Sequence, residues 1–125
     1  GATHLAGRAS QFEHKLPYSS FFGAVVMITK EDFKKINGYS NSYWGWGYED
    51  DDLYIRCRKN DVKITRRNCV YYSKDHPRDK SNVHNLEEHI KQVKQNFELT
   101  KNDGLNSIDR EEIISLPTST IKSTE

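Results

Sequence analysis

The sequence has few of the residues that mark several protein classes. Its 125 residues include two cysteines, three prolines and one methionine. No apolar run approaches the roughly 18–20 residues of a membrane-spanning helix, and residues 1–11 lack the apolar core of a secretory signal. We therefore expect no membrane span in this segment, and its length predicts one compact domain.

The two cysteines, Cys57 and Cys69, are too few for a disulfide framework and lack the spacing of a zinc site. We interpret them as ordinary small apolar residues. Because neither has an evident disulfide partner, they favour a reducing compartment, and with no signal in the segment this points to the cytoplasm.

An excess of one charge sign is also missing. Nineteen Lys and Arg residues stand against eighteen Asp and Glu residues, which gives a net charge of +1, and the two signs are interspersed. A nucleic-acid-binding domain normally has a strongly basic face. We therefore expect no nucleic-acid partner.

Periodicity and capping signals predict an α/β chain with a short mixed sheet and about three helices. We expect an irregular lead-in over residues 1–15, a domain over residues 16–108 and a polar, flexible tail over residues 109–125. The expected elements are a buried strand at Phe21–Ile28, helices at Lys30–Ile36, at Glu49–Lys59 and from Asn85 onward, and short strands at Val62–Thr65 and Cys69–Tyr72.

The densest functional signal is the segment WGWGYEDDD at residues 44–52, where aromatic residues and glycines run directly into four carboxylates. A sugar ring needs both kinds of group, because its CH face packs on an aromatic ring and its hydroxyls donate to carboxylates. One carboxylate can also accept the proton of an attacking hydroxyl as a general base. The segment therefore predicts a carbohydrate site.

A purely structural interpretation of this segment is also open. The tryptophans would then fill a small core, and the acids would stabilise the start of a helix. Four adjacent acids are harder to explain in this way, because neighbouring like charges raise one another's pKa.

Histidines and further loop residues are candidates for binding. His76 follows a predicted strand and either binds a divalent cation or is an ordinary surface histidine, which is the more common case. We interpret the other candidate histidines as surface residues, and the polar loop residues as either sugar-binding or turn-forming. These are His14, His84 and His89, and Asp79, Lys80, Asp103 and Asn106.

Four motifs together resemble the C-terminal, catalytic part of the β-1,4-galactosyltransferase family, including its N-acetylgalactosaminyltransferase relatives. They are PYSSFFGA at Pro17–Ala24, FKKINGYSNSYWGWGYEDDDLY at Phe33–Tyr54, HPRDK at His76–Lys80 and NDGLNS at Asn102–Ser107. The long central motif is the most specific of the four, and it favours a functional role for the acid run.

The resemblance implies an inverting, metal-dependent enzyme that moves a hexose from a UDP-sugar to the 4-hydroxyl of an acceptor N-acetylhexosamine. It implies Asp50 as general base, Glu49 and Asp51 as ligands of sugar hydroxyls, Trp46 as a platform between the sugars, and His76 as a manganese ligand. Phe21 stands where the family selects galactose or N-acetylgalactosamine, and both donors stay open. The other substrate-binding residues that we expect are Gly23, Gly47 and Asp79.

The resemblance also implies the C-terminal half of the A-type fold of nucleotide-diphospho-sugar transferases. The Asp-x-Asp motif that holds the metal and the diphosphate would lie upstream, so we expect a fragment that is inactive without an N-terminal nucleotide-binding half. Its partners would be that half, a UDP-sugar donor and an acceptor glycan, with Mn²⁺ in the complete enzyme. An animal-type member would lie in the Golgi lumen.

The sequence differs from the family pattern at two glycine positions, where it has Ala24 and Tyr48. The alternative to an enzyme is a non-catalytic carbohydrate- or calcium-binding module, although Glu49–Asp52 lacks the alternating ligands of a calcium loop. A metal-dependent hydrolase ranks last, because no second metal-ligating histidine is evident.

Overall fold

A computed structural model of the chain describes residues 1–9, 15–72 and 74–108. The helices are α1 (Lys30–Lys35), α2 (Glu49–Lys59) and α3 (Val83–Gln95), followed by the 3₁₀ turns η2 (Phe97–Thr100) and η3 (Leu105–Ser107). The strands are β1 (Ala2–His4), β2 (Arg8–Ala9), β3 (Val26–Ile28), β4 (Ile64–Arg66) and β5 (Val70–Tyr71).

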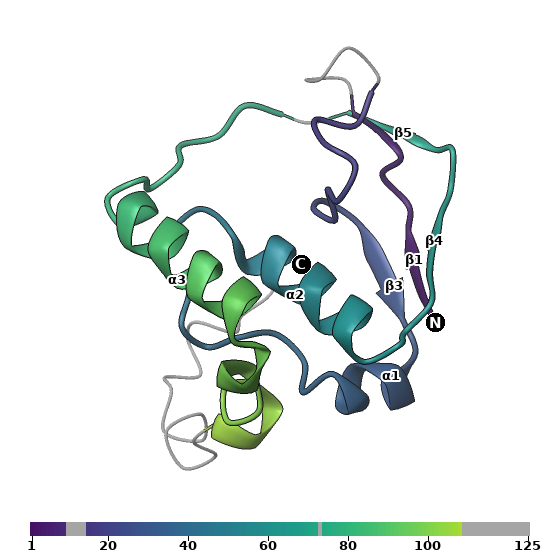
Figure 1. Cartoon of the computed structure of the whole chain (residues 1–125). Helices are drawn as coiled ribbons and strands as arrows, with labels where there is room; N and C mark the ends of the chain where they lie inside the picture. The colour runs from purple at the N-terminus through teal and green to yellow at the C-terminus, as the bar shows by residue number, and fades with distance from the viewer. Residues whose placement is uncertain (10–14, 73, 109–125) are drawn as a thin grey trace, which may run out of the picture.

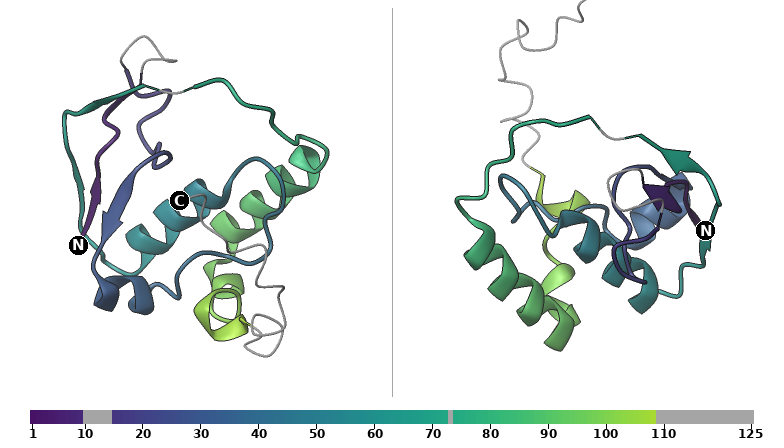
Figure 2. Two further views of the ribbon diagram at one scale, coloured as in Figure 1. Left: turned by 180° about the vertical axis from the view of Figure 1, so that it is seen from behind. Right: turned by 90° about the horizontal axis from the view of Figure 1, so that it is seen from above.

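Three strands form a small mixed sheet in the order β3-β1-β4. The central strand β1 runs antiparallel to β3 and parallel to β4, with His4 opposite Val26 on one side and Arg66 on the other. Strands β2 and β5 form a separate parallel pair. Helix α2 lies between this sheet and α3 (Figures 1 and 2). The predicted α/β class with a short mixed sheet is therefore confirmed.

The core lies between the sheet and α2. It consists of buried side chains from β1, the segment before β3, the end of α1, helix α2 and the segment before β4, namely Ala2, Phe22, Ile36, Leu53, Cys57 and Val62. Cys57 is thus a small apolar core residue, as predicted, whereas Cys69 is exposed and both thiols are free.

The prediction of an irregular lead-in over residues 1–15 is wrong for its first residues. Ala2 and His4 belong to the central strand of the sheet and are almost completely buried. A three-residue strand is too short to show an alternating pattern, and Ala is depleted in strands. The sequence therefore contained little signal for β1.

The predicted buried strand at Phe21–Ile28 is shorter and more exposed than expected. Only Val26–Ile28 is a strand, and Met27 is 61% exposed because β3 is an edge strand and Met27 does not face the core. Ala24 has a φ of 68°, which no regular strand allows. Residues 21–25 therefore form a loop, although they are as apolar as a strand. Phe21, Phe22 and Gly23 are buried in it, whereas Ala24 and Val25 are exposed.

The three predicted helices are confirmed. Thr29 accepts a hydrogen bond from the Asp32 amide at the start of α1, and α2 begins and ends where the charge pattern predicts. Helix α3 begins two residues before Asn85, and its apolar stripe is buried through Leu86, Ile90 and Val93. The predicted strands near residues 62–65 and 69–72 exist as β4 and β5, each paired with an earlier strand.

Two expectations concern other parts of the chain. The predicted tail over residues 109–125 lies outside the described residues. Among the helices that are described, none is long and apolar enough to cross a bilayer.

Candidate active site

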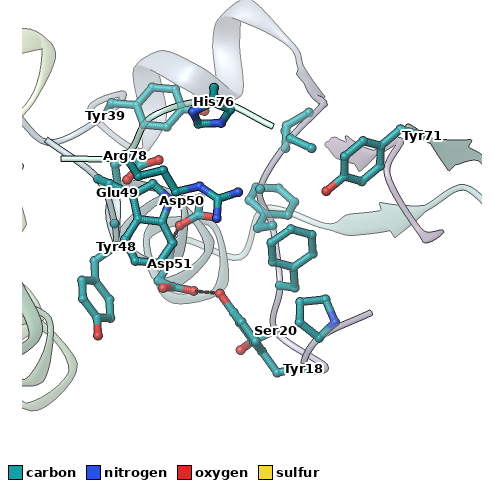
Figure 3. Close-up of a pocket in the computed structure, with 18 of the residues that line it drawn as sticks. Tyr18, Ser20, Tyr39, Tyr48, Glu49, Asp50, Asp51, Tyr71, His76 and Arg78 are labelled. Atoms are coloured by element: carbon teal, nitrogen blue, oxygen red, sulfur yellow. Dashed lines mark hydrogen bonds between the residues drawn. The ribbon is translucent and has the colours of Figure 1, made fainter. Parts of the chain in front are cut away.

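A pocket of about 970 Å³ opens at the N-terminus of α2 (Figure 3). The loop before β3, the tryptophan loop before α2 and the segment after β5 all contribute to its wall. Eight of the predicted site residues line it, namely Phe21, Gly23, Trp46, Gly47, Glu49, Asp50, Asp51 and His76, whereas the predicted loop candidates Asp79, Lys80, Asp103 and Asn106 do not. Residues far apart in the sequence therefore meet in one pocket.

The four consecutive acids divide between two environments. Glu49, Asp50 and Asp51 line the pocket, whereas Asp52 is completely buried and faces the core. All four lie in the first turn of α2, where the helix dipole favours negative charge. The acid run is thus both a helix start and a pocket wall.

Asp50 has the most unusual environment of the three pocket acids. It is half-buried, and this burial, together with the negative charges of Asp51 and Glu49, raises its pKa to about 6. Gly23 lies directly against it, since a Cβ atom on Gly23 would be 2.5 Å from the Asp50 Oδ2 atom. A carboxylate with a raised pKa in a pocket is suited to accept a proton.

Asp51 is held by a residue to which the sequence analysis assigned no role. The Tyr18 hydroxyl donates a 2.6 Å hydrogen bond to Asp51 Oδ1, drawn as a dashed line in Figure 3. Partial burial and this bond raise the pKa of Tyr18, so its phenol stays a donor. The only sequence signal for Tyr18 was its place in the motif PYSSFFGA.

Trp46 is exposed beside two cations. The Arg78 guanidinium and the Lys80 ammonium lie 5.6 Å and 5.3 Å from its ring centroid, which is within the range of cation–π attraction. Its amide donates a 2.8 Å hydrogen bond to the Asp79 carbonyl. Asp79 thus supports the tryptophan loop from outside the pocket.

The structural interpretation of the two tryptophans is therefore wrong. Trp44 is 73% exposed and Trp46 is 42% exposed, so neither fills the core. Arg78 also lines the pocket, and Figure 3 draws its side chain among the lining residues. No role was predicted for Arg78 from the sequence, where its place in the motif HPRDK was the available signal.

A buried polar network fixes the tryptophan loop to α2. Arg56 is completely buried and pairs with Asp52, while its guanidinium also donates to the carbonyls of Gly38 and Asp103. The Asp103 carboxylate accepts bonds from the Asn41 amide and the hydroxyls of Ser40 and Ser42. Asp103 therefore completes a loop rather than lining the pocket.

Asn106 has the same kind of structural role. Its side chain accepts a 2.9 Å hydrogen bond from the Asn37 side chain, and its amide donates to the Asn37 side-chain oxygen. The motif NDGLNS thus closes over the start of the tryptophan loop.

The two positions where the family pattern has glycine are left-handed in this chain. Ala24 has a φ of 68° and Tyr48, the residue before α2, has a φ of 70°. Residues with a Cβ atom adopt this region at a cost of about 1–2 kcal/mol. Both residues thus adopt a backbone conformation that glycine adopts without this cost.

His76 has one of the features of a metal ligand. Its Nδ1 atom is 2.9 Å from the Pro77 carbonyl, so Nδ1 donates there and Nε2 keeps a free lone pair. Among the described residues, however, no three His, Cys, Asp or Glu side chains are grouped to hold a metal ion. The described residues therefore do not form a complete manganese site by themselves.

The predictions for the other candidate histidines have different outcomes. His84 is exposed, as predicted, and His14 lies outside the described residues. His89 is not a simple surface residue, because its ring packs edge-on against Tyr43 at 5.1 Å and its Nε2 atom is buried.

Comparison with known proteins identifies relatives of this chain. A sequence model of a family, described as the N-terminal domain of galactosyltransferase, matches residues 3–84. Beta-1,4-galactosyltransferase 4 of Cricetulus griseus is 41% identical over 107 residues, which are 83% of this chain and 31% of that protein. Beta-1,4-galactosyltransferase 2 of Homo sapiens is 41% identical over 109 residues, which are 84% of this chain and 29% of that protein.

Two solved structures are also similar. The catalytic domain of Drosophila β1,4-galactosyltransferase 7 with xylobiose has 38% identity and a TM-score of 0.46 over 53% of this chain and 27% of that chain. A mutant of the same enzyme with manganese, UDP-Gal and xylobiose has 24% identity and a TM-score of 0.45 over 93% of this chain and 42% of that chain.

The chain spans about a third of the length of the curated relatives. The family description names an N-terminal domain, whereas the motifs predict a C-terminal part. The position of this chain in a longer enzyme therefore stays a prediction. The relatives named above are animal proteins and give no support to the cytoplasmic expectation.

Proposed function

Because this chain belongs to the β-1,4-galactosyltransferase family, we propose that it forms the catalytic-base side of an inverting glycosyltransferase. The donor would be a UDP-hexose, with galactose or N-acetylgalactosamine as the sugar, and the acceptor would be the hydroxyl of another sugar. The pocket at the N-terminus of α2 supports this proposal, since it combines carboxylates with exposed aromatic faces.

In the proposed reaction, Asp50 removes the proton of the acceptor hydroxyl. The hydroxyl oxygen forms a bond to the anomeric carbon of the donor, while the bond from that carbon to the diphosphate oxygen breaks. UDP leaves with the electron pair of that bond, and attack from the opposite face inverts the anomeric centre. The raised pKa of Asp50 supports its role, because a base is most effective when its pKa is near the working pH.

The other pocket residues bind and orient the two sugars. We propose that Glu49 and Asp51 accept hydrogen bonds from sugar hydroxyls, with Asp51 kept in place by Tyr18. Trp46 offers its ring as a platform, and Phe21, Gly23 and Gly47 shape the donor end. Asp79 contributes by supporting the tryptophan loop.

The proposed cofactor is Mn²⁺, which would neutralise charge on the diphosphate. His76 would supply one ligand through Nε2, and the remaining ligands would come from residues outside the described part of the chain. We therefore propose that the chain works with an N-terminal nucleotide-binding half. A location in the Golgi lumen follows if the protein is an animal-type member.

The observation that carries the proposal is the half-buried Asp50 carboxylate in a pocket with Trp46. Its test is Asp50→Asn in the full-length protein, assayed for UDP release from UDP-galactose and UDP-N-acetylgalactosamine. We expect turnover to fall by about 100-fold or more, because the amide keeps the shape but accepts no proton.

Asp61→Asn is the matched control, since Asp61 is exposed and away from this pocket. It should keep wild-type turnover. An Asp50→Asn enzyme with near wild-type activity would remove Asp50 from the role of base.

A further inference from the structure

The loop before β3 is attached to the sheet through three of its carbonyl groups. The His4 Nε2 atom lies 2.8 Å from the Gly23 carbonyl oxygen. The Arg66 guanidinium donates to the Phe21 carbonyl at 2.6 Å and to the Ser19 carbonyl at 2.8 Å. The loop is therefore held by one side chain from β1 and one from β4.

The two side chains also bond to each other. Arg66 Nη1 lies within hydrogen-bond distance of His4 Nδ1. Since a guanidinium only donates, His4 Nδ1 accepts and His4 Nε2 carries the proton that goes to Gly23. Burial and the Arg66 charge lower the pKa of His4, against the effect of its bond to the Gly23 carbonyl. The neutral imidazole thus fits its surroundings.

This pair of residues, which we call the carbonyl clamp, lies next to the proposed base. Gly23 is buried, and its backbone lies so close to Asp50 that a Cβ atom would be 2.5 Å from Oδ2. His4 also packs edge-on against Phe21, another pocket residue, at 5.6 Å. Any movement of the clamped loop away from α2 would open a path for water to Asp50.

We propose that His4 and Arg66 are positioning residues that hold Gly23 against Asp50 and thereby control how much water reaches this carboxylate. Neither side chain is among the residues that line the pocket. The importance of the clamp for catalysis rests on the proposed function, whereas its effect on the water around Asp50 does not depend on that function.

Other charged and titratable groups line the same pocket as Asp50 and have to be kept constant in a test. Glu49 and Asp51 are its neighbours on α2, and the rest of the pocket contributes Tyr18, Tyr39, Tyr48, Tyr71, His76, Arg78 and Lys94. Arg66→Lys leaves all of these in place and keeps the positive charge. It removes only the forked geometry that reaches several acceptors at once.

The experiment is a pH titration of the Asp50 side-chain carboxyl carbon by NMR in the full-length protein. In Arg66→Lys and in His4→Leu we expect the Asp50 pKa to fall by about one pH unit from about 6 toward its ordinary value of 3.8. His4→Gln retains a donor for Gly23 and should keep the wild-type titration.

Arg67→Lys is the matched control, because Arg67 is the next residue on the chain and is exposed. It should titrate like wild type. A folded Arg66→Lys protein with an unchanged Asp50 titration would overturn the proposal, and so would an equal shift in Arg67→Lys. If His4→Leu fails to fold, Arg66→Lys decides.

The same variants separate the clamp from the proposed function. If the wild-type protein turns over UDP-sugars, the acidic limb of kcat/KM should shift with the Asp50 titration. If the NMR shift occurs in a protein without turnover, the clamp stands and the proposed function is wrong.

Discussion

Asp50 owes its properties to the residues around it rather than to its own place in a motif. Burial and two neighbouring carboxylates raise its pKa to about 6, whereas Asp52, two residues further along α2, forms a buried ion pair with Arg56. The raised pKa makes Asp50 a stronger base than an ordinary carboxylate. The raised pKa also means that ionising Asp50 opposes folding. The protonated carboxyl therefore favours the folded state, and this stabilisation is lost as pH rises through about 6.

A pH profile of the full-length enzyme tests this environment. Because the base has to be ionised, we expect kcat/KM to fall as pH drops through about 6, by about tenfold per pH unit below it. Initial rates at low donor and acceptor concentrations between pH 4 and 8 measure this limb. A limb near pH 4, the range of an unperturbed Asp, would contradict the raised pKa.

At the scale of elements, the first turn of α2 has one feature that stabilises the helix and one that destabilises it. The helix dipole favours its acids, but the residue before it, Tyr48, is left-handed and provides no side-chain cap. Glycine at this position would avoid the steric cost. The start of α2 is therefore strained in this chain.

We expect Tyr48→Gly to raise the free energy of unfolding by about 1 kcal/mol, since it relieves the left-handed strain. Urea denaturation measures the change. Arg58→Gly is the control, because it places glycine on an exposed, regular position of the same helix and should lower stability by about 1 kcal/mol. A destabilised Tyr48→Gly protein would show that the Tyr48 side chain contributes more than its backbone costs.

The loop that carries Trp46 depends on the Asp103 carboxylate. We expect Asp103→Asn to lower the free energy of unfolding by about 2 kcal/mol, because an amide replaces an ionised acceptor of three hydrogen bonds. Burial opposes the ionisation of Asp103, but these bonds outweigh it and lower its pKa. Its contribution is thus present above pH 3.8 and lost as pH falls through the lowered pKa.

Thermal melting at pH 7 measures the effect of Asp103→Asn, with Asp61→Asn as a control that should stay within about 0.5 kcal/mol of wild type. If both variants melt alike, the Asp103 bonds contribute no net stability.

The helices could be predicted from the sequence because their signals are local. Thr29 and the acid run mark starts, and Asn37-Gly38 marks an end with two left-handed residues. The apolar stripe of α3 has a helical period. These signals do not depend on where the rest of the chain lies.

The parts that could not be predicted depend on distant residues. β1 is a strand because β3 and β4 pair with it on both sides, and nothing in Ala2–His4 itself indicates this. The WGWG and EDDD segments predicted the pocket, but Tyr18 and Arg78 join its wall through tertiary contacts, and the carbonyl clamp acts on it from outside, through the loop before β3. Motif membership was the only signal for the first two.

At the scale of the whole molecule, the chain is an α/β unit whose large pocket lies at the N-terminus of α2. It spans about a third of the length of its curated relatives, and among its described residues no three His, Cys, Asp or Glu side chains are grouped to hold a metal ion. We therefore expect the 125-residue chain alone to release no UDP from UDP-galactose or UDP-N-acetylgalactosamine with Mn²⁺ and acceptor sugars present. Turnover by this chain would show that it needs no nucleotide-binding half.

The place of β1 in the sheet has a consequence for the order in which the chain folds. His4 and Arg66 are neighbours in the sheet but 62 residues apart in sequence. Closing so long a loop costs entropy before any contact compensates it. Within this chain, β1 is therefore synthesised before β4 and gains its second neighbouring strand only after α1 and α2 have been synthesised.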